Sequence, residues 1–434
     1  MKRRAAAAIV AALLALPAAA VAAAQTPAAA ETFDKVWTIV RDTAFDKSFD
    51  SAAWDRARDE LRPRAIAAKT PGEFRGVLAE MLGRIGLSHF AVIPSTPDAP
   101  GDAVDLSGQA GFDVRLIKGK LLVTSVDPNR GAAAAGVHTG WIVDAIDSTP
   151  MASLLTPIVH DTPERLAQLE AWRVAQRRLR GPSHTRASVG FIDGSGGHVT
   201  RAVERTPEPG VPVNVGSLPT MYVRVSSALK ETGSGRSVGV IGFNVWMTAV
   251  DKPFQQALDR FRSADGIVID LRGNPGGLAA MIMGIAGHFV ADRATLGVMR
   301  TRDSELRFAV NPRLVNAVGE RVEPYSGPLA ILVDGMTGSA SECFAGGMQS
   351  LGRARVFGQT SMGQALPALF DRLPNGDVLI HAWGDFVTGT GVRIEGRGVV
   401  PDEPVPTTRE DLLAGRDSTL EAALRWIDSQ GAKR

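Results

Sequence analysis

Apolar residues recur at helical spacing through the first folded part of the chain. From about residue 31 to residue 86 they fall three and four positions apart, which places them on one face of a helix. The pattern ends at 83–86, where Gly-Arg-Ile-Gly breaks the helix, and a short apolar stretch then runs to Pro94. The sequence therefore predicts an N-terminal helical cap. Its repeating residues are Phe33, Val36, Trp37 and Val40, then Phe74, Val77, Leu78, Met81 and Leu82.

Residues 111–205 have the short apolar runs of a β domain. The segment GFDVRLIKGKLLVTSV predicts two strands that turn at Lys118-Gly119, and a short Ala-rich helix and the strand WIVDAID come next. A basic helix at 166–180 and strands near 186–205 complete this unit. Linkers rich in Pro, at 95–107 and 206–216, precede and follow it.

Strands and helices alternate in the remainder of the chain, which predicts an α/β unit with a layered sheet. The predicted strands are 238–245, 266–271, 329–333, 355–358 and 378–383, and the predicted helices are 252–263, 278–289 and 341–351.

The first residues have the pattern of an export signal. A basic start is followed by a run of Ala, Leu and Val, with small residues at Ala22 and Ala24. We expect cleavage after Ala24 and export as a soluble protein, in the periplasm or outside the cell. The alternative is a membrane anchor, which the short, Ala-rich apolar run disfavours.

Composition narrows the functional classes. The 434 residues suggest two or three domains, and a formal charge of +2 gives no strong field for nucleic acid or an anionic membrane. Cys343 is the only cysteine, so no intrachain disulfide and no Cys-based zinc cluster can form. There is no H-E-x-x-H motif, and we expect no metal and no cofactor.

The segment GIVIDLRGNPGG, 266–277, predicts a buried strand that runs into a glycine-rich turn before a helix. Unpaired backbone N–H groups in such a turn can bind an oxyanion or a phosphate. No P-loop lysine follows the glycines and no G-x-G-x-x-G occurs, which disfavours a nucleotide.

A nucleophile follows the next predicted strand. In LAILVDGMTGSASECFAGGMQ, Ser339 lies in a tight turn between strand and helix, a geometry that exposes a side chain. Ser341 is the competing nucleophile, although it suits an N-cap if the helix starts at 341.

The motifs DLRGNPGG, GSASE, GRARVFGQTSMGQA and GRGVVPDEPV occur in the order seen in C-terminal processing (tail-specific) serine peptidases, which this part of the chain resembles. The resemblance implies an α/β, crotonase/ClpP-like β-β-α core over 206–434. It also implies Ser339 as nucleophile, with an oxyanion hole formed by Ala340 N–H and Gly277 N–H, or by Gly276 in place of Gly277.

Residues 105–205 resemble a PDZ domain. The resemblance rests on Gly111-Phe112, at the usual carboxylate-binding loop, and on NRGAAAAGVHTGWIVDAID, in which Trp141 replaces the usual aspartate. It implies that apolar C-termini of protein substrates bind at Gly111 and Phe112 and add a strand to the sheet. The alternative is a small β domain with no ligand.

The base departs from the family pattern. These peptidases usually have a lysine where this chain has Gln364, and glutamine cannot accept the serine proton. Of the seven histidines, His89 in LGRIGLSHFAVIP resembles the histidine of the tricorn-like branch, with Ser88 before it. The resemblance implies that Glu395, in RIEGRGVVPD, orients His89 through Ser88. The alternative for His89 is a structural histidine, and for Glu395 a surface ion pair.

The sequence thus predicts an exported serine endopeptidase, with a signal peptide at 1–24, a helical cap at 25–104, a PDZ-like domain at 105–205 and a peptidase core at 206–434. Its partners are protein or peptide substrates, with no nucleic acid and no stable membrane insertion. Two alternatives are a catalytically inactive, peptidase-like binding module and a crotonase-like acyl-CoA enzyme, the second disfavoured by the export signal.

Overall fold

The computed structural model of the chain describes residues 18–96, 105–162, 164–216 and 218–431. Most of the predicted signal peptide, residues 1–17, lies outside the described residues. The chain forms two compact units. The first takes Met1–Asp102 and Ala368–Ala382, and the second takes Ala103–Pro367 and Trp383–Arg434.

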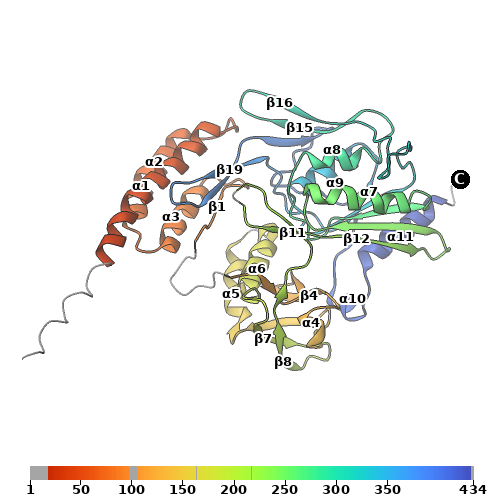
Figure 1. Cartoon of the computed structure of the whole chain (residues 1–434), viewed down its shortest axis with the longest axis horizontal. Helices are drawn as coiled ribbons and strands as arrows, with labels where there is room; N and C mark the ends of the chain where they lie inside the picture. The colour runs from red at the N-terminus through yellow and green to blue at the C-terminus, as the bar shows by residue number, and fades with distance from the viewer. Residues whose placement is uncertain (1–17, 97–104, 163, 217, 432–434) are drawn as a thin grey trace, which may run out of the picture. The chain divides into compact units, whose positions relative to one another are not determined.

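The first unit is a bundle of three helices with a small sheet (Figure 1). Asp50 and Thr70 cap the second and third helices, since each side chain accepts a hydrogen bond from a backbone N–H in the first turn. The predicted apolar residues of the cap are buried together, which confirms the helical periodicity. The elements are α1 (Ala18–Thr43), α2 (Ser51–Ala67), α3 (Pro71–Gly83), β1 (Ala91–Ile93), β19 (Ala368–Arg372) and β20 (Val378–Ala382).

The strand predicted at 378–383 forms as β20, but it does not join the core sheet. It pairs antiparallel with β1 on one side and β19 on the other. Leu373 and Leu379 are buried with the helices of the first unit, and the buried Arg75–Asp377 ion pair joins α3 to the same hairpin. The predicted peptidase core, 206–434, therefore includes a hairpin that belongs to the first compact unit, because the apolar face of this hairpin packs on the helices.

A mostly antiparallel sheet and two helices begin the second unit. The strand order is β3-β4-β5-β7-β8, which leaves β3 at an edge, and α6 packs along β3. Lys118 and Gly119 both have left-handed φ values at the β3–β4 turn, as the sequence predicted. The elements are β3 (Phe112–Ile117), β4 (Lys120–Val126), α4 (Gly131–Ala134), β5 (Ile142–Ile146), α5 (Met151–Asp161), α6 (Glu164–Leu179), β7 (Arg186–Ile192) and β8 (His198–Glu204).

The core of the second unit is a six-stranded sheet in the order β12-β13-β14-β17-β18-β22. The edge strand β12 is antiparallel, and the other neighbours pair in parallel. In the central strands β13, β14 and β17, alternate residues face opposite sides and both sides are buried, so these strands are mostly apolar, whereas the edge strand β12 is largely exposed. The strands are β12 (Val225–Glu231), β13 (Ser237–Phe243), β14 (Gly266–Asp270), β17 (Leu329–Val333), β18 (Arg355–Gly358) and β22 (Glu403–Pro404).

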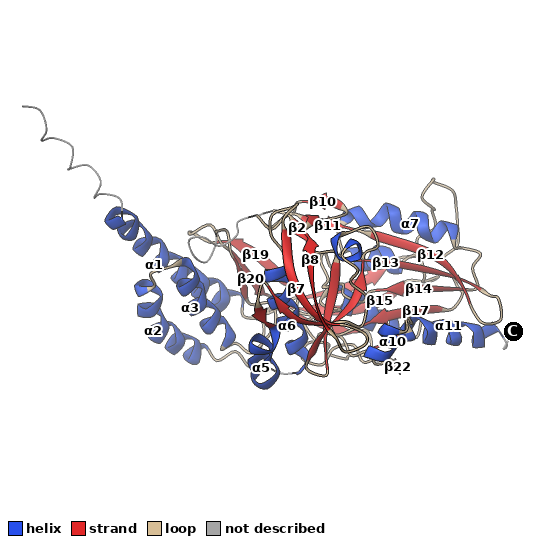
Figure 2. Ribbon diagram, turned by 90° about the horizontal axis from the view of Figure 1, so that it is seen from below, coloured by secondary structure: helices blue, strands red, loops and turns tan. Residues whose placement is uncertain are grey.

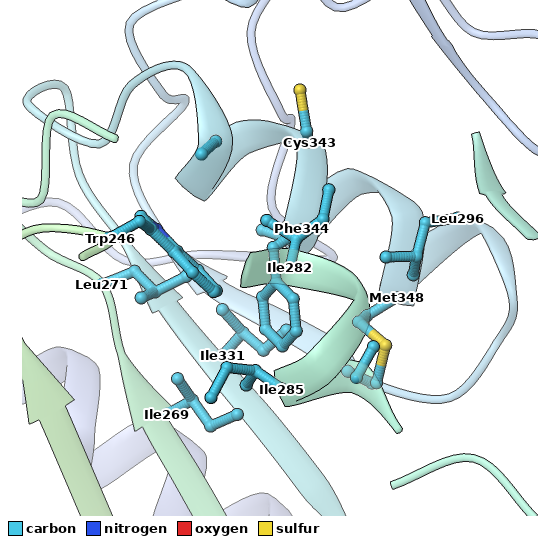
Figure 3. Close-up of a cluster of buried hydrophobic side chains, with 14 of the residues drawn as sticks. Trp246, Ile269, Leu271, Ile282, Ile285, Leu296, Ile331, Cys343, Phe344 and Met348 are labelled. Carbon is cyan, nitrogen blue, oxygen red and sulfur yellow. The ribbon is translucent and has the colours of Figure 1, made fainter. Parts of the chain in front are cut away.

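Helices cover both faces of this sheet (Figures 1 and 2). On one face, Trp246, Ile282 and Phe344 pack above Ile269 and Ile331 (Figure 3). The helix predicted at 278–289 is shorter in the structure, where α8 has only six residues. Residues 271–280, which precede it, form turns and irregular backbone instead. The helices are α7 (Asp251–Arg260), α8 (Met281–Ala286) and α9 (Ala340–Ser350) on one face, and α11 (Ser418–Gly431) on the other.

A second, smaller sheet in the order β16-β15-β21 lies beside α8 and α9. Its strands are β15 (Ala294–Arg300), β16 (Glu305–Val310) and β21 (Asp385–Thr388). The remaining short elements are β2 (Gly108–Gln109), β6 (Thr149–Pro150), β9 (Thr206–Pro207), β10 (Val211–Val213), β11 (Met221–Val223), the 3-10 helix Thr248–Val250 and α10 (Arg409–Leu413).

Candidate active site

The glycine-rich turn after β14 is built around Asn274, whose side chain is fully buried. Its Nδ2 donates to the carbonyl of Phe243 (2.8 Å), and its Oδ1 accepts from Gly276 N–H (3.0 Å). Its own carbonyl accepts from Gly338 N–H (3.0 Å). One residue therefore joins the end of β13, the glycine turn and the segment before Ser339. Asn274 carries no functional signal in the sequence, since asparagine is common in turns of every kind.

Gly276 has a φ of 106°, and a methyl group placed on it would lie 2.6 Å from Ser339 Cβ and 3.0 Å from Ala340 N. The turn and the serine segment are thus in direct contact, as the sequence predicted for an oxyanion site. Only glycine fits at this position, because of both its φ and this close approach.

Two backbone N–H groups at this contact have no hydrogen-bond acceptor within the described part of the chain. One is Gly277 N–H, and the other is Ala340 N–H, which is the first of α9 and so lacks an intrahelical acceptor. Gly276 N–H, the alternative donor, is already bound to Asn274. Of the two glycines proposed from the sequence, Gly277 is the one whose N–H remains available.

Ser339 lies on a sharp turn between β17 and α9, with φ 52° and ψ −120°. A serine in this strained conformation is held by its surroundings. Its N–H donates to the carbonyl of Gln364 (2.8 Å) and to Glu342 Oε2 (3.0 Å). The residue is half-buried, so part of its side chain remains accessible.

Ser341 occupies a different environment. The helix begins at Ala340 rather than at 341, and Ser341 is fully buried. Its hydroxyl accepts a hydrogen bond from Trp246 Nε1 at 2.8 Å. Ser341 therefore anchors α9 to the core and is not an N-cap, which leaves Ser339 as the accessible serine of the motif.

Gln364 contacts the serine turn through its backbone. Its carbonyl accepts from Ser339 N–H, and its own N–H donates to Glu342 Oε2 (2.9 Å). The position that usually carries the lysine is therefore next to Ser339 in space, but it presents an amide that cannot act as a base.

Glu395 is in the second unit and is largely buried, with 8% of its surface exposed. Its Oε2 accepts from Ala365 N–H at 2.9 Å. Because Ala365 follows Gln364 directly, this carboxylate lies one residue from the segment that contacts Ser339. A surface ion pair, the alternative for Glu395, does not fit its burial.

His89 is in the first unit, between α3 and β1, and has a left-handed φ of 58°. Its Nδ1 is 2.8 Å from Ser88 Oγ. Protein surrounds most of the ring, and this desolvation lowers the pKa of His89 to about 4. The ring is therefore neutral at physiological pH and has Nε2 left for another partner.

Two other histidines have structural explanations. His288 is fully buried among aromatic rings, and burial lowers its pKa to about 4. His381 lies on β20 in the first unit, where its Nε2 is 2.8 Å from Asp371 and its Nδ1 is 3.1 Å from Thr43 Oγ1. Both histidines are committed to packing or to local hydrogen bonds.

The β3–α6 region contacts the segment that leads to Ser339. Arg115 on β3 donates to Asp113 (2.5 Å) and to Asp334 (3.0 Å), and Asp334 also accepts from Gly273 N–H (2.8 Å). Burial alone would lower the pKa of Arg115, but the carboxylates of Asp113 and Asp334 outweigh it and raise this pKa. Burial alone would raise the pKa of Asp334, but Arg115 and backbone N–H donors outweigh it and lower this pKa. Leu169 of α6 is also buried against Met336 and Met362.

Gly111 and Phe112, the predicted carboxylate-binding residues, open the edge strand β3. Gly111 has a φ of 82°, and a methyl group on it would lie 2.5 Å from Arg130 Cβ. The free edge of β3 beside α6 is the arrangement that strand addition requires. The PDZ-like assignment itself stays a prediction.

Among the described residues, no group of three His, Cys, Asp or Glu side chains is arranged to hold a metal ion. In the same residues, no helix is long and apolar enough to cross a membrane.

The chain is similar to known peptidases. Residues 226–405 match Peptidase family S41, and residues 27–83 match the Tricorn protease C1 domain. A putative tricorn protease homolog 2 of Streptomyces coelicolor is 24% identical over 426 residues, 92% of this chain and 32% of the homolog. A carboxyl-terminal-processing protease of Synechocystis is 28% identical over 399 residues, 90% of this chain and 83% of the relative.

A solved structure, the photosystem II D1 C-terminal processing protease, aligns with a TM-score of 0.56 at 20% identity, over 91% of this chain and 96% of its own. The chain spans about a third of the tricorn homolog but most of the processing protease. The α/β fold class and the resemblance to C-terminal processing peptidases are confirmed. The chain therefore contains a serine-peptidase region that is similar to Peptidase family S41, and before it a segment that is similar to the Tricorn protease C1 domain.

Proposed function

We propose that this protein is an exported endopeptidase of the C-terminal processing type that cleaves through an acyl-enzyme on Ser339, with His89 as the base. The observation that carries the proposal is the contact between the Gly276-Gly277 turn and the Ser339 turn. This contact supports an arrangement in which Ser339, the nucleophile, lies beside the N–H groups of Gly277 and Ala340, which have no acceptor within the described part of the chain.

In this mechanism Ser339 Oγ attacks the carbonyl carbon of the scissile bond while His89 Nε2 takes the hydroxyl proton. The negative charge that develops on the carbonyl oxygen is bound by Gly277 N–H and Ala340 N–H. The intermediate collapses, the C–N bond breaks, and the leaving amine takes the proton from the imidazolium. Water then attacks the ester by the same steps in reverse order and restores Ser339.

Ser88 and Glu395 support the base. The short contact between Ser88 Oγ and His89 Nδ1 fixes the ring and leaves Nε2 for Ser339. In the proposal the Glu395 carboxylate stabilises the imidazolium through Ser88. The lowered pKa of His89 favours a neutral ring that can accept a proton, whereas Gln364 offers no base at the usual lysine position.

The proposed substrates are proteins or peptides with apolar C-termini. The free edge of β3 could take the C-terminal segment as an added strand, with its carboxylate at the N–H groups of Gly111 and Phe112. The basic and then Ala-rich first 24 residues support export, with cleavage after Ala24.

The test measures hydrolysis of an unfolded protein with an apolar C-terminus, together with labelling of the enzyme by a serine-directed fluorophosphonate. We expect Ser339→Ala and His89→Ala to abolish cleavage, and the matched variant Gln364→Ala to keep most of it. A wild-type protein that neither cleaves nor is labelled would instead be an inactive binding module. A His89→Ala variant that cleaves as fast as wild type would exclude His89 as the base.

A further inference from the structure

The carboxylate of Glu342 is hydrogen-bonded to the Ser339 turn and is fully buried. Its Oε1 accepts from Ser361 Oγ (2.5 Å) and Gly363 N–H (2.6 Å). Its Oε2 accepts from Gln364 N–H (2.9 Å) and Ser339 N–H (3.0 Å). The mechanism above assigns no role to this group, although it contacts the proposed nucleophile's own backbone.

These four bonds join two segments that are distant in sequence. One is the turn at Ser339, and the other is 361–364, which carries Gln364 in place of the lysine. Ser361 Oγ also accepts from Val399 N–H (2.7 Å), so the segment that follows Glu395 is attached to the same group. A single carboxylate therefore holds the nucleophile turn in register with its two neighbouring loops.

The four donors fit only the ionised carboxylate. Two oxygens without a proton can accept all four bonds, whereas a protonated carboxyl has one oxygen that must itself donate. Since all four partners are donors in the geometry observed, protonation would displace at least one of them. Ser361 is the one partner whose hydroxyl could rotate to accept, and it would then turn its own proton away from Glu342.

The hydrogen-bond partners of the Glu342 carboxylate carry no charge, since they are three backbone N–H groups and one hydroxyl. The titratable groups around it are the buried thiol of the adjacent Cys343, whose pKa burial raises, and the carboxylates of Asp385 and Glu395, which raise the same pKa together with Glu342. No Lys, Arg or His forms a hydrogen bond or an ion pair with Glu342 in the described part of the chain. Burial without a cationic partner raises the pKa of Glu342 to about 7, even though the four hydrogen bonds oppose this rise.

We propose that Glu342 is a positioning residue, whose ionised carboxylate holds the Ser339 turn against the 361–364 segment and whose protonation disarms the peptidase. This inference rests on the proposed function of Ser339. Glu342 touches no substrate atom in this scheme and acts only through the two segments that it joins.

The sign of the pH effect follows from the raised pKa. As the pH rises through about 7, Glu342 ionises, its four acceptor bonds become complete, and activity increases. Stability changes in the opposite sense, because an unfolded glutamate ionises near 4.5 and the folded one only near 7. The folded state therefore loses stability as the pH rises between these values, while the site becomes competent.

The experiment compares kcat and KM from pH 5 to pH 9 for wild type, Glu342→Gln, Glu342→Asp and the control Glu323→Gln, whose side chain is exposed. We expect the wild-type kcat to fall about tenfold per pH unit below 7, with little change in KM. Glu342→Gln should lose the inflection near 7 and be about a hundredfold slower at pH 8. Glu342→Asp should keep an inflection and part of the rate, and Glu323→Gln should match wild type.

An infrared titration of the wild-type protein, which needs no variant, should show a buried carboxyl with the same midpoint as the kcat profile. If Glu342→Gln is active and keeps the wild-type inflection, or if the buried carboxyl titrates far from that inflection, the inference is wrong. A wild type that is neither active nor labelled by fluorophosphonate at any pH would instead overturn the proposed function, so the two failures are distinguishable.

Discussion

Ser339 and His89 both adopt a left-handed φ that is unusual for their residue types, and the chain holds them in different ways. Ser339 follows a strand buried on both faces, and the backbone N–H groups of its turn donate hydrogen bonds to Glu342, to the Gln364 carbonyl and to the Asn274 carbonyl. His89 follows a helix end and precedes a three-residue edge strand, and its Nδ1 contacts the hydroxyl of the adjacent Ser88.

The difference teaches how each strained residue should respond to change. The Ser339 turn belongs to the sheet core, where several hydrogen bonds and packing contacts fix its conformation. Substitutions there should therefore reduce both activity and stability. The His89 segment depends on local contacts, so substitutions there should alter chemistry with little loss of stability. Five predictions test this contrast.

The largest effect is expected at the glycine turn. Gly276→Ala would place a methyl group 2.6 Å from Ser339 Cβ at a φ of 106°, which forces the two turns apart. We expect a loss of kcat/KM of about 1,000-fold, the size of losing an oxyanion donor. The matched control is Gly284→Ala, where nothing lies within 4 Å of the added methyl. Equal activity in the two variants would show that the contact is not needed.

Asn274→Ala should damage the serine turn through its scaffold. It leaves the Phe243 carbonyl and Gly276 N–H without their buried partner, which we expect to cost about 2–4 kcal/mol in unfolding free energy. Denaturant unfolding measures this loss, and kcat/KM should fall about a hundredfold. Asn129→Ala, at an exposed asparagine, should change stability by less than about 0.5 kcal/mol.

Arg115→Ala breaks the connection between β3 and the segment before Ser339. Asp334 would lose its cation while remaining buried, so stability should fall by about 3 kcal/mol. We expect kcat/KM to fall about tenfold, with Arg186→Ala, at an exposed arginine of β7, unchanged. If Arg115→Ala has the same free energy of unfolding as wild type, the Arg115–Asp334 ion pair does not stabilise this connection.

Ser88→Ala is the matching change on the histidine side. It removes the hydroxyl that contacts His89 Nδ1, so the ring loses its orientation while the surrounding packing stays. We expect a several-fold to tenfold loss of kcat and a stability change of about 1 kcal/mol or less. A stability loss as large as that of Asn274→Ala would contradict the contrast between the two regions.

The smallest effect concerns acid stability. The pKa of folded His89 is lowered to about 4 by burial. The ring therefore binds a proton near pH 6.5 in the unfolded chain, but only near pH 4 in the folded protein. Stability should therefore fall as the pH falls from about 6.5 to 4. His89→Gln should remove about 1 kcal/mol of this loss at pH 5, as measured by urea unfolding, and make no such difference at pH 8.

Periodicity and motif order were enough to predict much of this protein. The apolar strands of the core, the helical cap, the turn at Lys118-Gly119 and the serine turn all formed where the sequence indicated, because each depends on local spacing and turn chemistry. The resemblance to C-terminal processing peptidases also followed from sequence, since the motifs occur in order along one stretch of chain.

Tertiary structure decided what local pattern could not express. The strand at 378–382 joined the helical unit because its apolar face packs against those helices. Its own residues do not indicate which sheet it enters. Ser341 became a buried anchor because Trp246, nearly a hundred residues earlier, donates to it. Asn274 acquired its role only when the Phe243 carbonyl and Gly338 N–H came within hydrogen-bond distance of it. Glu342 acquired its role in the same way from Gly363 N–H and Gln364 N–H, and such convergence depends on the packing of whole segments.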